Sequence, residues 1–99
     1  MTDGLRKTDQ AVTEALRLLQ EECAELIVEV NKCCRFGFDS VHYKTGIPHR
    51  SSMVTEIADV LTLIDILKQQ GIIAEEEIAL AKNAKILKLK RWTNLYEQD

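Results

Sequence analysis

The stretch TDQAVTEALRLLQEECAELIVEVNKCCR, residues 8–35, decides the fold class of this chain. Its apolar residues recur at steps of three and four, which is the spacing of one face of an α-helix. The residues on this face are Val12, Leu16, Leu19, Cys23, Leu26, Val30 and Cys34. We therefore expect one long helix from about Thr8 to Arg35.

The rest of the chain reads as a loop and two further helices. Residues 36–50 contain two glycines and the only proline, and they predict a long connecting loop. A second helix is expected from Ser51 or Ser52, either of which suits an N-cap, to the residue before Gly71. A third begins near Ala74, where three glutamates suit the positive end of the helix dipole, and closes in a basic turn.

These patterns predict an all-α protein, a helical bundle of about three main helices. The 99 residues fit one domain, 1–99, with its motif-bearing part at about 16–91. The second helix is apolar over an arc wider than the single stripe of an ordinary surface helix. The residues of this arc are Met53, Ile57, Val60, Leu61, Leu63, Ile64, Ile66 and Leu67. We expect a homo-oligomer that completes a larger bundle, with a two-fold dimer as the usual solution.

Composition excludes several classes of function. The net charge of −3 and the pI near 5.4 argue against a general nucleic-acid binder. No apolar run approaches the roughly 18–20 residues of a membrane span, and the N-terminus lacks the apolar region of a signal peptide. Cys23, Cys33 and Cys34 form neither a disulfide framework nor a zinc motif, so we expect buried, reduced thiols and a cytoplasmic protein.

Two pairs of acidic residues are the most informative chemical feature. Glu22 and Glu25, and likewise Glu56 and Asp59, are three residues apart, so each pair lies on one face of its helix. The second pair falls on or at the edge of the apolar face, where an ionised carboxylate without a partner costs several kcal/mol at least. Either pair alone is also explained by a solvated surface. Both together, on adjacent antiparallel helices, favour a metal site.

Ligand chemistry selects the metal. Sites made of carboxylates suit Mg²⁺, with Mn²⁺ as a substitute, and leave positions for water and substrate phosphates. The Glu-x-x-His pattern of di-iron bundles is missing, and His42 and His49 are expected to be polar loop residues rather than ligands.

A magnesium cluster between helices predicts a polyphosphate substrate. Basic residues near the acidic helix and on the third helix are the candidates for holding it. They are Lys32, Arg35, Lys82 and Lys85. A further carboxylate would accept a proton from the attacking water, and the sequence leaves the choice between Glu21 and Glu29 open.

The ordered acidic motifs resemble those of a known family. Residues 21–25, EECAE, followed by residues 56–59, EIAD, are similar to the EExxE…ExxD signature of the all-α nucleoside triphosphate pyrophosphohydrolases, the MazG-like superfamily. The segment KCCRFG at 32–37 and the break at Gly71 before an acid-started third helix also resemble this family. The resemblance covers roughly Leu16 to Arg91.

The resemblance implies a reaction and assigns roles. It implies Mg²⁺-dependent hydrolysis of a nucleoside triphosphate, ribose or deoxyribose, between the α and β phosphates, which gives the monophosphate and pyrophosphate. The metal ligands would be Glu22, Glu25, Glu56 and Asp59, with Glu21 as the leading acid of the catalytic motif, and the assembly a homodimer or homotetramer. Two alternatives stay open: a phosphoribosyl-ATP pyrophosphohydrolase, and a non-catalytic helical module that binds nucleotide or protein around a structural Mg²⁺.

Overall fold

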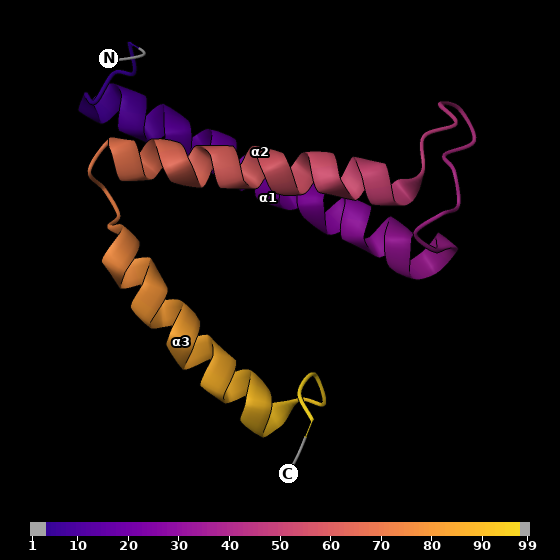
Figure 1. The fold of residues 1–99 in the computed structure, drawn as a ribbon. Helices are drawn as coiled ribbons and strands as arrows, with labels where there is room; N and C mark the ends of the chain where they lie inside the picture. Colours follow the sequence, from indigo (N-terminus) through magenta and orange to yellow (C-terminus); the bar gives the residue numbers. More distant parts are fainter. Residues whose placement is uncertain (1–3, 98–99) are drawn as a thin grey trace.

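The computed structural model describes residues 4–97, and this part of the chain is helical without any β-strand (Figure 1). The three helices are α1, Asp9–Phe36, α2, His49–Gln69, and α3, Glu75–Trp92. The predicted all-α class with three main helices is confirmed. No helix within these residues is long and apolar enough to cross a membrane.

Helix α1 begins and ends close to the predicted positions. Thr8 is its N-cap, and the Thr8 Oγ1 accepts a hydrogen bond of 3.1 Å from the backbone N–H of Ala11. This bond satisfies one of the amide donors that every helix N-terminus leaves open. The helix ends where Gly37 takes a positive φ of 92° and donates its N–H to the Cys33 carbonyl.

Helix α2 begins earlier than predicted, so the choice of Ser51 or Ser52 as its N-cap is wrong. The N-cap is Pro48, and both serines lie inside the first turn. The loop before the helix supplies the missing caps, since the backbone N–H of His49 donates to Ser40 at 2.9 Å and that of Arg50 donates to Phe38 at 3.0 Å. Carbonyls about ten residues away in sequence thus replace a local side-chain cap.

The corner between α2 and α3 is held by short-range bonds. Gly71 has a φ of 79°, and the N–H of Ile72 donates to the Leu67 carbonyl at 3.0 Å, which ends α2 in the usual glycine-based way. On the other side of the corner, the Lys68 Nζ lies 2.6 Å from the Glu75 Oε2, so the last turn of α2 is tied to the first residue of α3. This ion pair raises the pKa of Lys68 and lowers that of Glu75.

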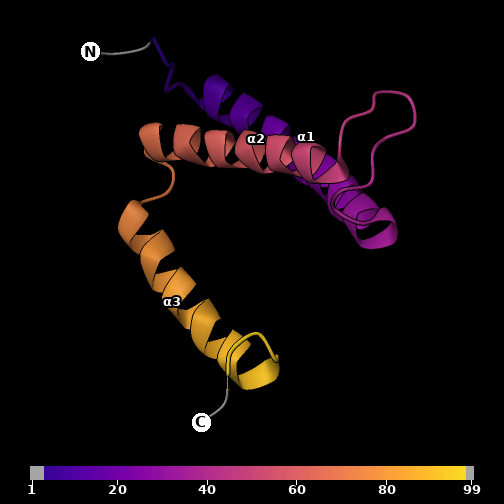
Figure 2. The same ribbon diagram turned by 45° about the vertical axis from the view of Figure 1, so that its right-hand side comes forward.

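Helices α1 and α2 lie side by side and antiparallel, as both ribbon views show (Figures 1 and 2). The apolar residues buried between them are few: Ala15, Cys33, Leu63 and Leu67. This core is thin for the length of the helices, and no apolar side chain of the described residues is less than 2% exposed.

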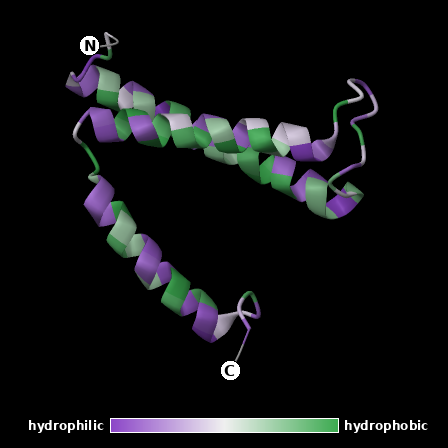
Figure 3. Ribbon diagram, in the orientation of Figure 1, coloured by the Kyte–Doolittle hydropathy of each residue, from purple (hydrophilic) through white to green (hydrophobic). Residues whose placement is uncertain are grey.

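Helix α3 turns away from this pair after Gly71 and has no comparable contact with α1 or α2 (Figures 1 and 2). None of its residues is buried, and apolar positions recur along its open surface (Figure 3). The radius of gyration is 17.1 Å, whereas a compact domain of 100 residues has about 13 Å. A single chain therefore has an open, extended shape.

The apolar stripe of α1 is only partly covered by α2. Leu16 is 45% exposed and Val30 is 41% exposed. Cys23 and Cys34 of the stripe are also exposed, and all three cysteines are free as expected. The prediction of buried thiols is therefore right for Cys33 alone in the single chain. On α2, Ile57 and Leu61 are likewise exposed, which agrees with an apolar arc too wide for one neighbour.

Candidate metal centre

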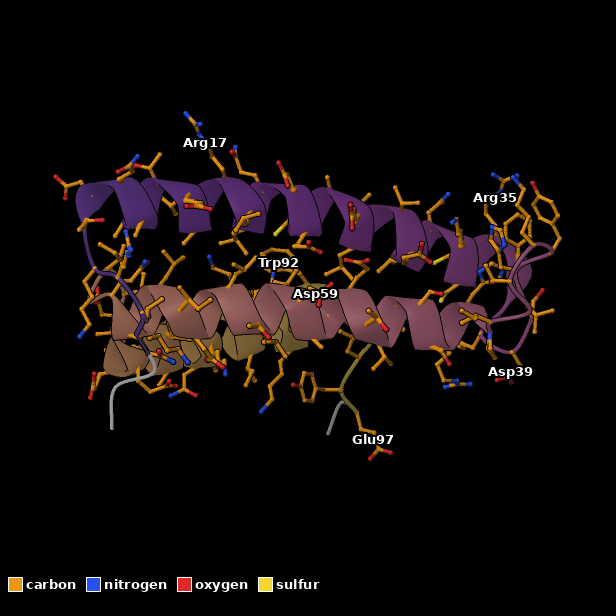
Figure 4. All side chains as sticks on the ribbon, turned by 90° about the horizontal axis from the view of Figure 1, so that it is seen from above. Arg17, Arg35, Asp39, Asp59, Trp92 and Glu97 are labelled. Carbon is orange, nitrogen blue, oxygen red and sulfur yellow. The ribbon has the colours of Figure 1, made fainter. Side chains whose placement is uncertain are left out.

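Three acidic side chains meet in the middle of the α1–α2 pair. Glu22 comes from α1, and Glu56 and Asp59 come from successive turns of α2. One carboxylate oxygen of each lies within 4.8 Å of one oxygen of both others. Asp59 lies on the edge of α2 next to α1, whereas Arg17 points away from the pair (Figure 4). The half-buried position of Glu56 and Asp59 matches the expectation that this pair lies on or at the edge of the apolar face of its helix.

Two oxygens of this cluster are buried without a donor. The Oε2 atoms of Glu22 and Glu56 have no hydrogen-bond partner, and the only other such side-chain atom within residues 4–97 is the Oε1 of Gln70. Buried polar atoms are nearly always satisfied in folded proteins. A hard divalent cation binds carboxylate oxygens of this kind, so the donor set fits Mg²⁺ or Mn²⁺.

The electrostatics of the cluster point the same way. The pKa of Glu56 is raised from 4.5 to about 7. The first cause is the neighbouring Glu22 carboxylate, which would accept a hydrogen bond from Glu56 only if Glu56 carried a proton, and the next is desolvation. The negative charges of Glu22, Glu25 and Asp59 raise the pKa further. The cluster therefore needs positive charge, which it takes from a proton when no cation is bound.

The remaining acidic residues of the α1 motif lie outside this group of three. Glu25 is exposed and does not join the group, but its charge still acts on Glu56. Glu21 is exposed on α1. Glu29 is half-buried and its Oε1 lies 3.3 Å from the Lys32 Nζ. Of the four predicted ligands, the structure thus brings together Glu22, Glu56 and Asp59.

The predicted phosphate-binding residues lie in three different places. Lys32 is engaged with Glu29, and the Arg35 guanidinium lies 5.1 Å from the centre of the Phe36 ring. Lys82 and Lys85 are exposed on α3, which diverges from the helices that carry the acidic cluster (Figure 1). Within one chain, no predicted lysine or arginine joins the cluster directly.

The interpretation of both histidines as polar loop residues is wrong for His49. His49 is the first residue of α2, is only 5% exposed, and stacks on Phe36 with the ring centres 5.5 Å apart. His42 does lie in the loop, next to this stack. The two histidines border a hollow of about 330 Å³ whose other lining residues are Lys32, Phe36, Ser40, Val41 and Tyr43. A prediction that started this helix directly after Pro48 would have placed His49 in the helix rather than in the loop.

The geometry defines a class of site, namely a carboxylate cluster between two antiparallel helices that is suited to a hard divalent cation. Comparison of the chain with protein-family models, with curated proteins and with solved structures finds no match in any of the three.

Proposed function

We propose that this protein is a Mg²⁺-dependent nucleoside triphosphate pyrophosphohydrolase. The observation that carries the proposal is the pair of donorless, buried carboxylate oxygens on Glu22 and Glu56, with Asp59 beside them. The order of the motifs, EECAE and then EIAD on the next helix, supports the same reaction.

Each residue of the cluster has a role in this reaction. Glu22, Glu56 and Asp59 hold the ion, and their half-buried position in mid-helix keeps their geometry fixed. When bound, Mg²⁺ supplies charge for the phosphate oxygens and activates water for attack on phosphorus. Glu25 is exposed beside the cluster, and we assign it to orienting that water. Glu21 remains the alternative proton acceptor, since Glu29 is already paired with Lys32.

The test is pyrophosphate release from a panel of ribo- and deoxyribonucleoside triphosphates, with Mg²⁺ and then with Mn²⁺. Glu56→Gln and Asp59→Asn should each abolish turnover while helicity by circular dichroism is kept. Glu14→Gln, an equal loss of charge on exposed α1 surface, should leave turnover unchanged.

The outcomes separate the proposal from its rivals. Retained turnover in both variants would exclude the acidic cluster as the site. Activity on phosphoribosyl-ATP alone would identify the biosynthetic pyrophosphohydrolase. Binding of Mg²⁺ without pyrophosphate release from any substrate would leave a helical module with a structural ion.

A further inference from the structure

Helix α1 has a lateral apolar face beside the face that packs on α2. Its residues follow one another at steps of four, three, four, three and four, which is the spacing of a seam between packed helices. This face, called the α1 seam below, consists of Leu16, Gln20, Cys23, Ile27, Val30 and Cys34. All six residues are exposed, and Ile27, at 70%, is the most exposed large apolar residue of the helix.

The rest of the chain leaves the α1 seam open. Helix α2 packs on the face of α1 that carries the buried Ala15 and Cys33. Helix α3 turns away after Gly71 and has no comparable contact with α1 in the described part of the chain (Figures 1 and 2). Two hollows of about 710 and 570 Å³ follow the seam, and none of the residues that line them is charged. The seam therefore suits an apolar partner surface without charge.

The single chain has enough uncovered area for such an interface. Its accessible area is 8103 Å², whereas compact monomers of 11.3 kDa expose about 5,700 Å². The difference, about 2,400 Å² per chain, exceeds the ~800 Å² that each partner buries in a standard interface. The α1 seam is part of this excess.

The pattern of the seam is the same when it is read from either end. Cys23, Ile27, Val30 and Cys34 are a cysteine, two β-branched residues and a cysteine, at steps of four, three and four in both directions. A two-fold axis pairs residue i of one copy with residue j of the other and j with i, so it requires a self-complementary surface. The α1 seam meets this requirement about a point midway between Ile27 and Val30.

Charge also favours a second copy as the partner. The chain has a net charge of −3, so two copies repel each other over much of their surface. The seam has no charge of its own, and its lining has none either, so two seams meet without repulsion. A second copy thus supplies both the apolar character and the matching residue spacing.

We propose that two copies of the chain pack antiparallel along their α1 seams, so that Cys23 of each copy faces Cys34 of the other. Ile27 of each copy then lies against Val30 of the other at the two-fold axis. Four exposed apolar or thiol side chains per copy become covered in this way. The interface does not depend on the proposed hydrolase function.

The facing cysteines make this interface sensitive to oxidation. A disulfide needs Cα atoms about 4.4–6.8 Å apart. Packed helices have axes about 8–10 Å apart and Cα radii of roughly 2.3 Å, so facing Cα atoms reach this range. With a low-molecular-weight disulfide as oxidant, the two thiols of a pair give up two electrons and two protons and form one S–S bond. The oxidant is reduced to two thiols.

The first experiment oxidises the full chain with oxidised glutathione in metal-free buffer. Both disulfides of each chain lie within one pair of copies, so the product should be a covalent dimer of twice the 11.3 kDa chain mass, without larger species. Trypsin cuts after Arg17, Lys32 and Arg35, and the expected linked peptides are 18–32 and 33–35. A ladder of covalent multimers, or no covalent dimer, would overturn the proposal.

The second experiment fixes the register with single-cysteine changes. Cys23→Ser and Cys34→Ser should each fail to cross-link alone, because the remaining thiol faces a serine. Mixed in equal amounts before oxidation, they should form a covalent heterodimer through the one complete pair. Cys33→Ala, which changes the buried cysteine, should cross-link like the wild type. Efficient cross-linking of either serine variant with itself, or none in the mixture, would exclude this register.

The third experiment tests the interface without oxidation. Ile27→Glu places charges next to the two-fold axis, so sedimentation under reducing conditions should show association at least tenfold weaker than in the wild type. The matched control is Val28→Glu, because Val28 is also exposed but points about 100° away around the helix. Circular dichroism shows whether both variants keep their helices. Unchanged association of folded Ile27→Glu, or equal weakening by Val28→Glu, would exclude the seam.

Discussion

At the scale of single residues, Glu56 is the most informative member of the acidic cluster. It is a half-buried carboxyl group of α2 that lies near Glu22 of α1 and near Asp59 of its own helix, and its pKa is raised to about 7. Residues selected for stability alone would not concentrate like charges at this position, because the repulsion and the desolvation both oppose folding. The site is thus a local electrostatic conflict, which a bound cation would relieve.

The raised pKa of Glu56 makes the stability of the folded chain depend on pH in a definite direction. The group binds its proton more tightly in the folded chain, at a pKa of about 7, than in the unfolded chain, at 4.5. Its contribution to stability is therefore full below pH 4.5 and is lost as the pH rises toward 7. In metal-free buffer, Glu56→Gln should raise the melting temperature at pH 8 and flatten its fall between pH 5 and pH 8.

The same variant separates stability from binding. Added Mg²⁺ should raise the melting temperature of the wild type but not that of Glu56→Gln, because the ion stabilises only a state that binds it. Glu14→Gln keeps the cluster, so its melting temperature should fall with pH as steeply as that of the wild type. If the melting temperature fell equally steeply with pH in the wild type and in Glu56→Gln, the raised pKa of Glu56 would be contradicted.

At the scale of elements, the helices themselves were predictable and their junctions were less so. The apolar spacing of α1, the stop at Gly71 and the acidic start of α3 are local signals, and the structure contains each of them. The N-terminus of α2 was missed because loop carbonyls cap it, and no local pattern reveals which distant carbonyls approach a helix end. Likewise, helical spacing alone did not show that Glu22 rather than Glu25 faces α2.

The N-cap of α1 gives a test at this scale. Thr8→Ala removes the acceptor for the Ala11 amide, and such a loss costs about 1 kcal/mol of unfolding free energy. Thr13→Ala, on the exposed surface inside the same helix, should be neutral or slightly stabilising, because alanine has the higher helix propensity. Denaturant unfolding at one protein concentration measures both. An equal loss in the two variants would show that the cap is not the cause.

At the scale of the whole molecule, the open shape leaves much apolar surface of a single chain uncovered. The core between α1 and α2 is thin, and α3 has no neighbour within the described part of the chain that covers it. If the missing packing comes from a second copy, stability includes the free energy of association.

Stability should therefore depend on protein concentration. We expect the melting temperature to rise steadily over a hundredfold increase in concentration, as mass action requires for a folded oligomer that dissociates to unfolded chains. Leu89→Glu, which places a charge at a half-buried apolar position of α3, should lower the melting temperature and weaken this dependence if that position packs against a second copy. A melting temperature that is independent of concentration in the wild type would contradict coupled folding and assembly.

The way in which α2 begins has a consequence for local motion. The first amide groups of α2 are bonded to carbonyls of the preceding loop, and the ring of His49 is stacked on Phe36 at the end of α1. This helix end cannot fray alone, since its amide hydrogens become exchangeable with solvent only when the loop detaches. We therefore expect the loop, the first turn of α2 and the last turn of α1 to open as one cooperative unit, which would also move the wall of the histidine-lined hollow.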